Sequence, residues 1–182
     1  MRSLFSVLLV ALAMSACSSQ RIASDAVLNE RVVLILSPQG SDPARDTVGF
    51  NNLSRRVTQA FSSDLLPRLG QHGKTAVNVI DQGTEYNVGQ KLAMYSVRER
   101  AKTAIVLTLE TDTVEGDERL SLRAQWVDQR PIVENGSMRG VTAVSTVERS
   151  YVLRGSRSGD NPKSMSDLAS NFIDAMKSQG KL

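Results

Sequence analysis

A seven-residue run, RVVLILS at residues 31–37, restricts the fold of this chain more than any other feature of its sequence. The run consists almost entirely of β-branched residues and leucine. A strand with one face in water alternates apolar and polar side chains, whereas a strand covered on both faces reads as a continuous apolar run. The run therefore predicts a strand that is covered on both faces.

A first helix is predicted after this strand. Residues 38–47 contain two prolines and a glycine, which interrupt regular structure. Apolar residues then recur at spacings of three and four, which places them on one face of a helix. We expect Pro67 and Gly70 to end this helix. Its apolar face consists of Phe50, Leu53, Val57, Phe61 and Leu65.

A second strand and a second helix come next. Residues 75–81 (TAVNVID) are typical of a strand, and Asn87 with Gln90 three residues later is typical of a helix start. We expect this helix to run to about Lys102, and residues 104–110 (AIVLTLE) to form a third strand. The helix residues that we expect to face inward are Leu92, Ala93 and Val97.

The following stretch favours an antiparallel pair. Residues 120–128 alternate apolar and polar side chains, which indicates a half-exposed strand antiparallel to the one before it. We interpret residues 112–119 as the turn before this strand, residues 129–140 as a longer loop after it, and residues 141–153 as a fifth strand. The inward face of the alternating strand carries Leu120, Leu122, Ala124 and Trp126.

The chain closes with an amphipathic helix. Ser164 with Asp167 three residues later predicts its N-cap, and Gly180 predicts its end. The apolar residues are spaced to form one face. They are Met165, Leu168, Ala169, Phe172, Ile173 and Met176.

The predicted order is therefore β-α-β-α-β-β-β-α. Alternating elements followed by a meander imply an α+β fold, a mixed sheet of about five strands with helices packed on it. We expect residues 31–182 to form a single domain, because their number is that of one domain. The chain is 41% hydrophobic but only 4% aromatic, so the core is expected to be aliphatic.

Residues 1–16 have the pattern of a secretory signal, with a charged start, a short apolar stretch and small residues before a cleavage point. The apolar stretch is about half of the roughly 20 residues that cross a bilayer. Ser15 and Ala16 before Cys17 resemble a bacterial lipobox, which implies that Cys17 is acylated and becomes the first residue of the mature chain. Cys17 is the only cysteine, so the mature chain would hold no free thiol and no disulfide.

Ser18 after the cysteine favours the outer membrane by resemblance, because an aspartate there resembles an inner-membrane retention signal. We therefore expect a lipid-anchored protein on the periplasmic side of the outer membrane, joined to it by a short polar tether at residues 17–30. The 13 residues after Cys17 in this tether would span at most ~45 Å.

The element order, the stretch AKTAIVLTLET at residues 101–111 and the strand ending in WVD at residues 126–128 resemble a known group of envelope domains. The group includes the TolB amino-terminal region, the penicillin-binding-protein activator lipoproteins, the curli secretion lipoprotein and the Pel polysaccharide export lipoprotein. The resemblance implies a non-enzymatic accessory or assembly factor of an envelope secretion or export machine. An activator of a peptidoglycan synthase and an envelope-polymer hydrolase are the alternatives.

Few residues point to bond chemistry. The stretch GQHGKT at residues 70–75 contains part of a phosphate-binding loop, but it follows a predicted helix and opens a strand, the reverse of what that loop needs. His72 is the only histidine, which excludes a zinc site with paired histidines. The acidic residues of the turn lack the spacing of a calcium loop, and we expect no metal and no cofactor there. They are Glu110, Asp112, Glu115, Asp117 and Glu118.

Binding is the expected activity, with the membrane contacted through the lipid at Cys17 and an envelope protein as partner. Charges of both signs are interleaved and the net charge is only +3, so nucleic acid is not expected. Pro131, Ile132 and Val133 in the predicted loop are the candidate partner surface. Trp126 is expected to pack in the core, with a contact to a partner or to the membrane interface as the other interpretation. A homo-oligomer is left open.

Overall fold

The computed structural model describes residues 27–38, 48–81, 87–114, 117–154 and 164–182. The predicted signal peptide, Cys17 and most of the predicted tether lie outside these residues. The first described residues already belong to the fold, because Leu28 is buried and the first strand begins at Asn29, two residues earlier than predicted. Among the described residues, no helix combines the length and the apolar character that crossing a membrane requires.

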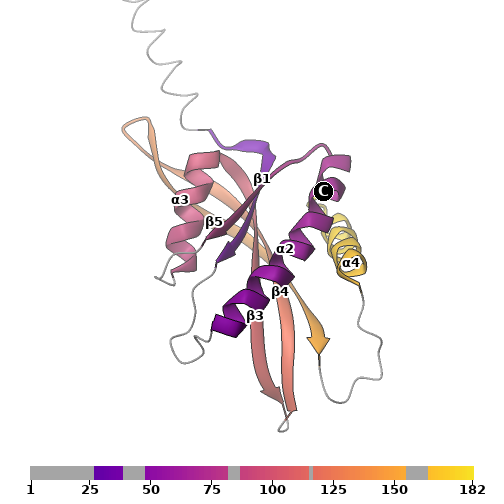
Figure 1. Cartoon of the computed structure of the whole chain (residues 1–182). Helices are drawn as coiled ribbons and strands as arrows, with labels where there is room; N and C mark the ends of the chain where they lie inside the picture. The colour runs from indigo at the N-terminus through magenta and orange to yellow at the C-terminus, as the bar shows by residue number, and fades with distance from the viewer. Residues whose placement is uncertain (1–26, 39–47, 82–86, 115–116, 155–163) are drawn as a thin grey trace, which may run out of the picture.

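The elements follow one another in the predicted order, and the strands form one mixed sheet in the order β2-β1-β3-β4-β5 (Figure 1). The α+β fold with a mixed five-stranded sheet is confirmed. The elements are β1 (Asn29–Pro38), α2 (Val48–Gln71), β2 (Thr75–Asp81), α3 (Val88–Glu99), β3 (Ala101–Val114), β4 (Asp117–Glu134), β5 (Ser137–Arg154) and α4 (Met165–Ser178).

Chain topology places helices on both faces of β1. β1 is parallel to β2 on one side and to β3 on the other. The chain steps from β1 to β2 through α2 and then back past β1 to β3 through α3. Since such crossovers are right-handed, the two opposite steps place α2 and α3 on opposite faces of the sheet. The continuous apolar run at residues 31–37 is the sequence counterpart of this arrangement.

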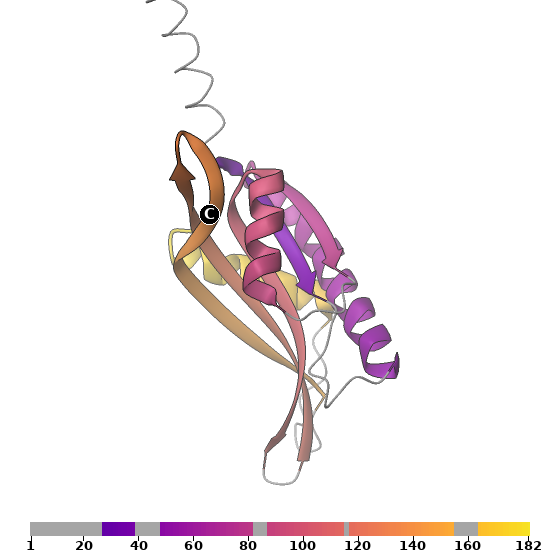
Figure 2. The same ribbon diagram turned by 90° about the vertical axis from the view of Figure 1, so that its left-hand side faces the viewer.

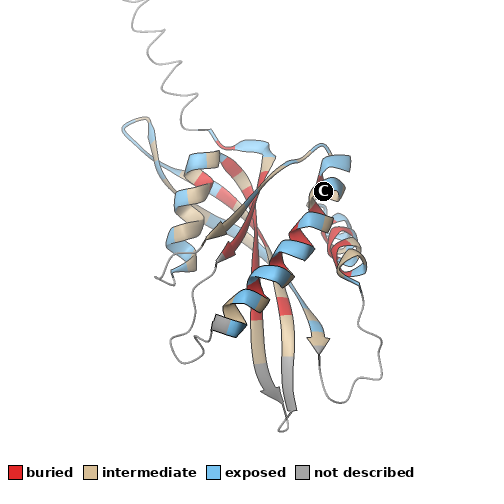
Figure 3. Cartoon of the chain, in the orientation of Figure 1, coloured by how far each residue is buried: buried red, intermediate tan, exposed pale blue. Residues whose placement is uncertain are grey.

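The larger core lies between the sheet and the helices α2 and α4 (Figures 1 and 3). Val33 and Ile35 of β1 point into it, and Phe172 of α4 meets Phe61 of α2 edge to face with ring centroids 6.2 Å apart. The fully buried side chains of this core also include Leu65, Leu69, Ile105, Leu107, Leu122, Ala124, Trp126 and Met176.

The smaller core lies on the other face, under α3. Leu34 and Leu36 of β1 point into it together with Ala101 and Ala104, and Leu92 and Tyr95 of α3 pack against them. Each of the four β1 residues at positions 33–36 has an exposed fraction of 0%. The prediction that this strand is covered on both faces is therefore confirmed.

Helix α2 does not end at Pro67 as predicted, but continues to Gln71. A proline inside a helix removes one backbone hydrogen bond. Contacts outside the local sequence hold this last turn in place. Leu69 is fully buried, and the Arg68 guanidinium donates to Ser166 and Ser170 of α4. Tertiary packing thus outweighs the local signal of the proline.

The buried face of α2 also differs from the predicted one. Phe61 and Leu65 are buried as expected, whereas Phe50, Leu53 and Val57 are only partly buried. The remaining positions that face inward carry small polar residues, whose hydroxyl groups bond within the helix or to β2. Thr58 donates to the Ser54 carbonyl, and Ser62 accepts from Asn78 of β2 at 3.0 Å.

Helix α3 begins as predicted, with the Asn87 side chain accepting from the Gln90 amide at 3.0 Å. It ends at Glu99, three residues before the expected Lys102, because Arg100 adopts a left-handed conformation with φ 53°. This conformation turns the chain directly into β3, and the Arg100 carbonyl accepts from the Asn29 amide of β1. Pairing between β1 and β3 therefore includes residues that the sequence predicted to be helical.

Helix α4 has the predicted capping box. Ser164 and Asp167 exchange hydrogen bonds between side chain and backbone in both directions. The apolar face predicted for this helix is buried at Leu168, Ala169, Phe172, Ile173 and Met176.

The predicted loop at residues 129–140 is wrong, because these residues continue β4 and begin β5 (Figure 2). The two strands meet at a two-residue turn, Asn135–Gly136, in which both residues have positive φ, 51° and 76°. Asn-Gly is the preferred pair for such a hairpin turn. Similarly, β3 and β4 extend into the predicted turn at residues 112–119, with Val114 paired to Asp117.

Candidate contact surface on a two-stranded ribbon

Beyond the main sheet, β4 and β5 continue as a two-stranded segment, which we call the ribbon and define as residues 129–143. The last residue of β4 that pairs with β3 is Asp128, opposite Thr103. From Gln129 onward, β4 pairs only with β5. A two-stranded hairpin is marginal in water on its own. Within the ribbon each strand has a single strand neighbour, whereas β4 has two in the main sheet.

The ribbon carries exposed apolar residues on both of its faces. Ile132 is 44% exposed and Val133 is 45% exposed, and Pro131 before them is half-buried. Successive residues of a strand point to opposite faces, so Ile132 and Val133 lie on different faces of the ribbon. The three residues predicted as a partner surface are therefore brought together, but on a strand rather than in a loop.

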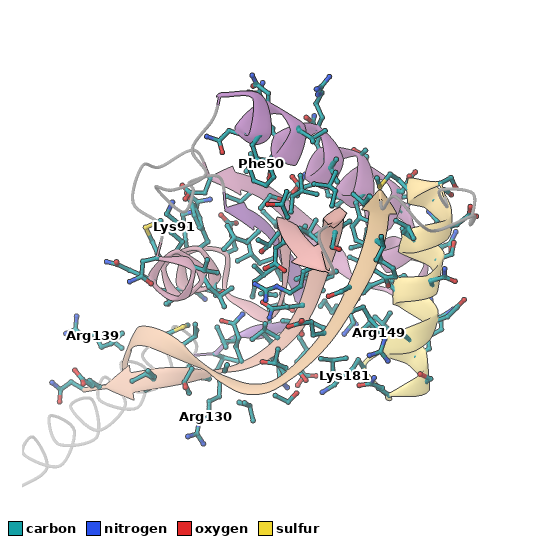
Figure 4. All side chains as sticks on the ribbon, turned by 90° about the horizontal axis from the view of Figure 1, so that it is seen from below. Phe50, Lys91, Arg130, Arg139, Arg149 and Lys181 are labelled. Carbon is teal, nitrogen blue, oxygen red and sulfur yellow. The ribbon has the colours of Figure 1, made fainter. Side chains whose placement is uncertain are left out.

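Two basic residues lie beside these apolar residues. Arg130 precedes Pro131 on β4, and Arg139 lies on β5 at an irregularity where the register shifts between Ile132 and Val133. Both arginines are exposed, and Figure 4 shows their side chains directed away from the body of the sheet. Apolar and basic groups therefore occupy the same short segment.

The base of the ribbon is fixed by a hydrogen-bonded cluster around Asp128. Its carboxylate accepts from Trp126 Nε1 and from Ser145 Oγ, each at 2.8 Å, and from Lys181 Nζ. Lys181 Nζ also donates to Ser145 Oγ at 2.7 Å, and it lies between β5 and α4 (Figure 4). Burial alone would raise the pKa of Asp128, but the hydrogen bonds from Lys181, Ser145 and Trp126 lower it. The cluster ties the C-terminal residues to the sheet.

Trp126 belongs to this support and not to the surface. Its side chain is 1% exposed and packs in the larger core. The interpretation of Trp126 as a core residue is confirmed, and its indole is not available for the alternative partner contact.

Gln129 is the first residue of the ribbon and lies on the opposite face of β4 from Trp126 and Asp128. It is only 3% exposed, and neither of its side-chain amide atoms has a hydrogen-bond partner among the described residues. An unsatisfied buried polar group costs about 1–3 kcal/mol. The buried amide of Gln129 therefore lowers the stability of the ribbon at the point where it leaves the sheet.

A second polar cluster joins the end of β2 to α3. Asp81 forms an ion pair with Lys91 and accepts from the Tyr95 hydroxyl at 3.2 Å, while Arg98 stacks over the Tyr95 ring. Burial, together with the hydrogen bond to Asp81, raises the pKa of Tyr95. These contacts hold α3 against the sheet.

The remaining candidates from the sequence are structural. Residues 70–75 join the end of α2 to β2. A phosphate-binding loop needs the opposite order, from a strand into a helix. The His72 amide donates to the Leu69 carbonyl within this connection. Glu110 of the predicted acidic turn pairs with Arg123 at 2.6 Å. The side chains of Asp112, Glu115, Asp117 and Glu118 lie outside the described residues.

Within the described part of the chain, no cluster of three or more histidine, cysteine, aspartate or glutamate side chains is placed to hold a metal ion.

No protein-family model and no curated protein matches this chain. Among solved structures it is similar to a PelC dodecamer from Paraburkholderia phytofirmans, with 17% identity over 80% of this chain and 84% of that chain and a TM-score of 0.31. It is similar to lipoprotein GNA1162 from Neisseria meningitidis, with 15% identity over 81% of this chain and 96% of that chain and a TM-score of 0.39.

A neuraminyllactose-binding hemagglutinin homolog from Helicobacter pylori is similar with 11% identity, over 85% of this chain and 88% of that chain, at a TM-score of 0.32. At TM-scores below 0.4 these three likenesses carry no argument about what this chain does.

Proposed function

We propose that this protein is a non-catalytic lipoprotein of the bacterial outer membrane, anchored through Cys17 on the periplasmic side. It acts by binding, as an accessory or assembly factor of an envelope secretion or export machine. The pattern of residues 1–17 supports the anchor. The ribbon supports the binding role, because it presents apolar side chains to solvent on a supported β-hairpin.

The observation that carries the proposal is the exposure of Ile132 and Val133, at 44% and 45%, on a segment that extends past the sheet. Val27, Met94, Val144 and Val152 are also exposed, but Ile132 and Val133 are adjacent in the chain and lie together on the ribbon. Contact surfaces draw their affinity from a few apolar or aromatic residues that lose water on binding. Ile132 and Val133 are placed to act in this way.

The test is a double substitution, Ile132→Asp with Val133→Asp, in cells whose envelope phenotype without this protein has been measured. We expect this variant to behave as the deletion while remaining folded and membrane-bound. Val152→Asp is the matched control, because Val152 is 55% exposed on β5 and lies nine residues beyond the end of the ribbon at residue 143. His72→Ala is expected to be silent. A silent ribbon variant together with an essential His72 would instead favour the hydrolase.

The anchor has a separate test. Cys17→Ser removes the sulfur that would receive the lipid, so we expect an unprocessed precursor with no acyl mass. A Cys17→Ser protein that is still cleaved and still sediments with outer membranes would contradict the lipoprotein proposal.

A further inference from the structure

We infer that the ribbon lies on the same membrane surface that holds the lipid anchor. In this arrangement Ile132 and Val133 enter the headgroup region, and Arg130 and Arg139 contact lipid phosphates. The inference rests on the proposed acylation of Cys17, and it names the bilayer as the first partner of the ribbon. Contact with the bilayer would position the domain for the envelope machine, so the inference specifies what the surface proposed above binds.

The place where the chain enters the fold supports this inference. Leu28 is buried and β1 starts at Asn29. Figures 1 and 2, which view the molecule from directions 90° apart, both show the start of β1 at the same end of the molecule as the ribbon turn. An anchor attached through the N-terminus therefore brings this end, and not the opposite end, toward the membrane.

The short chain between Cys17 and the start of the fold keeps the domain close to the membrane. Nine residues lie between Cys17 and Val27, and the ten residue-to-residue steps from one to the other span at most about 35 Å when fully extended. The ribbon runs six residues along β4 from the last β3 pairing at Asp128 to Glu134, which corresponds to roughly 20 Å of strand. The ribbon is thus long enough to bridge much of the distance that the tether permits.

The chemistry of the ribbon favours a lipid interface over a protein groove. Ile132 and Val133 are exposed on different faces, and a groove on a partner protein would usually cover one face. A tip that enters an interface is surrounded on all sides. Within residues 129–143 two arginines stand against one carboxylate, Glu134, which gives a net charge of +1. Arginine side chains can bury their stems in an apolar layer and keep the guanidinium at the phosphates.

The acylated chain offers a direct test, because Cys17 is the only cysteine and its sulfur is occupied by lipid. An introduced cysteine is then the only thiol for an environment-sensitive nitrobenzoxadiazole dye. Ile132→Cys places the dye on the β4 side of the ribbon. Val152→Cys is the matched control, because Val152 is 55% exposed on β5 but lies outside the ribbon. Both mature proteins are reconstituted into vesicles of phosphatidylethanolamine and phosphatidylglycerol that contain a spin-labelled quencher lipid.

We expect the dye at position 132 to shift its emission to the blue and to be quenched several-fold more strongly than the dye at position 152. Arg130→Gln with Arg139→Gln is expected to reduce the quenching at position 132, as is replacement of the anionic lipid by phosphatidylcholine. Equal quenching at the two positions would overturn the inference while leaving the anchor intact. Shielding of position 132 in cells, without quenching in vesicles, would also overturn it and indicate a protein partner.

The mass of the intact mature protein separates the two failures. A mass without acyl chains would contradict the proposed lipoprotein, and the membrane contact inferred here would fall with it. An acylated protein whose ribbon is not quenched would contradict only the membrane contact.

Discussion

The central strand β1 and the ribbon are both short strand segments with adjacent aliphatic residues, yet they have opposite environments. Leu34 and Ile35 of β1 are fully buried, whereas Ile132 and Val133 of the ribbon are 44% and 45% exposed. β1 has a strand on each side and helices on both faces. In the ribbon, β4 no longer pairs with β3. Coverage by neighbouring elements, and not apolar content, decides which residues are buried.

The largest expected difference between the two regions is in stability. Phe172→Ala empties a fully buried position that contacts Phe61 in the larger core. We expect it to lower the free energy of unfolding by about 3–5 kcal/mol. Ile132→Ala on the ribbon should change it by only about 0.5 kcal/mol. Chemical denaturation of both variants measures the contrast, and similar losses would show that the ribbon is part of the cooperative core.

An intermediate effect is expected at the ribbon turn. Gly136 has φ 76°, a left-handed conformation that costs a residue with a side chain roughly 1–2 kcal/mol. Gly136→Ala should therefore weaken the ribbon, and amide hydrogen exchange should become faster at residues 129–143 while β1 stays protected.

Gly49→Ala is the control for this substitution, because no atom lies within 4 Å of the added Cβ and its φ is not positive. Faster exchange throughout β1 in Gly136→Ala would show that the ribbon and the core open together.

The smallest effect is expected at the junction between the two regions. Hydrogen bonds from Lys181, Ser145 and Trp126 outweigh burial and hold the pKa of Asp128 below its usual value. Because the folded pKa is the lower one, this contribution to stability is present above the ordinary value of about 3.9 and is lost as the pH falls below it.

The Asp128→Asn variant should therefore lose less stability than the unchanged protein as the pH falls. The difference should be about 1 kcal/mol or less, because the Asp128–Lys181 pair is partly exposed. Denaturation midpoints measured at falling pH test this expectation. An unchanged acid slope in the variant would mean that Asp128 does not link the ribbon base to the C-terminus.

Local patterns predicted the elements where a single periodicity applied. The alternation at residues 120–128 identified the antiparallel strand, and Ser164 with Asp167 identified the start of α4. The ribbon was missed because Pro131 and the glycines at 136 and 140 favour a loop interpretation. The Asn135–Gly136 pair was the signal that could have corrected it, since this pair is typical of a two-residue hairpin turn.

The exposure of the candidate contact surface was predicted in part, and its contact role stays a prediction. Ile132 and Val133 stood out in the sequence as apolar residues in a polar stretch, and the structure places both at the surface. The placement of these two residues on different faces of a ribbon was not predictable, because it depends on strand pairing. The polar face of α2 was missed for a related reason, since Thr58 and Ser62 satisfy their hydroxyl groups through contacts that periodicity does not show.

The sequence by itself determined the order of the elements, the burial of β1 on both faces and the capping of α4. These properties depend on side chains that are neighbours along the chain, and hydrophobic periodicity and capping report them directly. Only the tertiary structure decided that α2 continues through Pro67, that Lys181 reaches Asp128, and that the ribbon extends past β3 with its apolar residues uncovered. Each of these depends on residues far apart in the chain, whose contacts form only when the sheet and its helices come together.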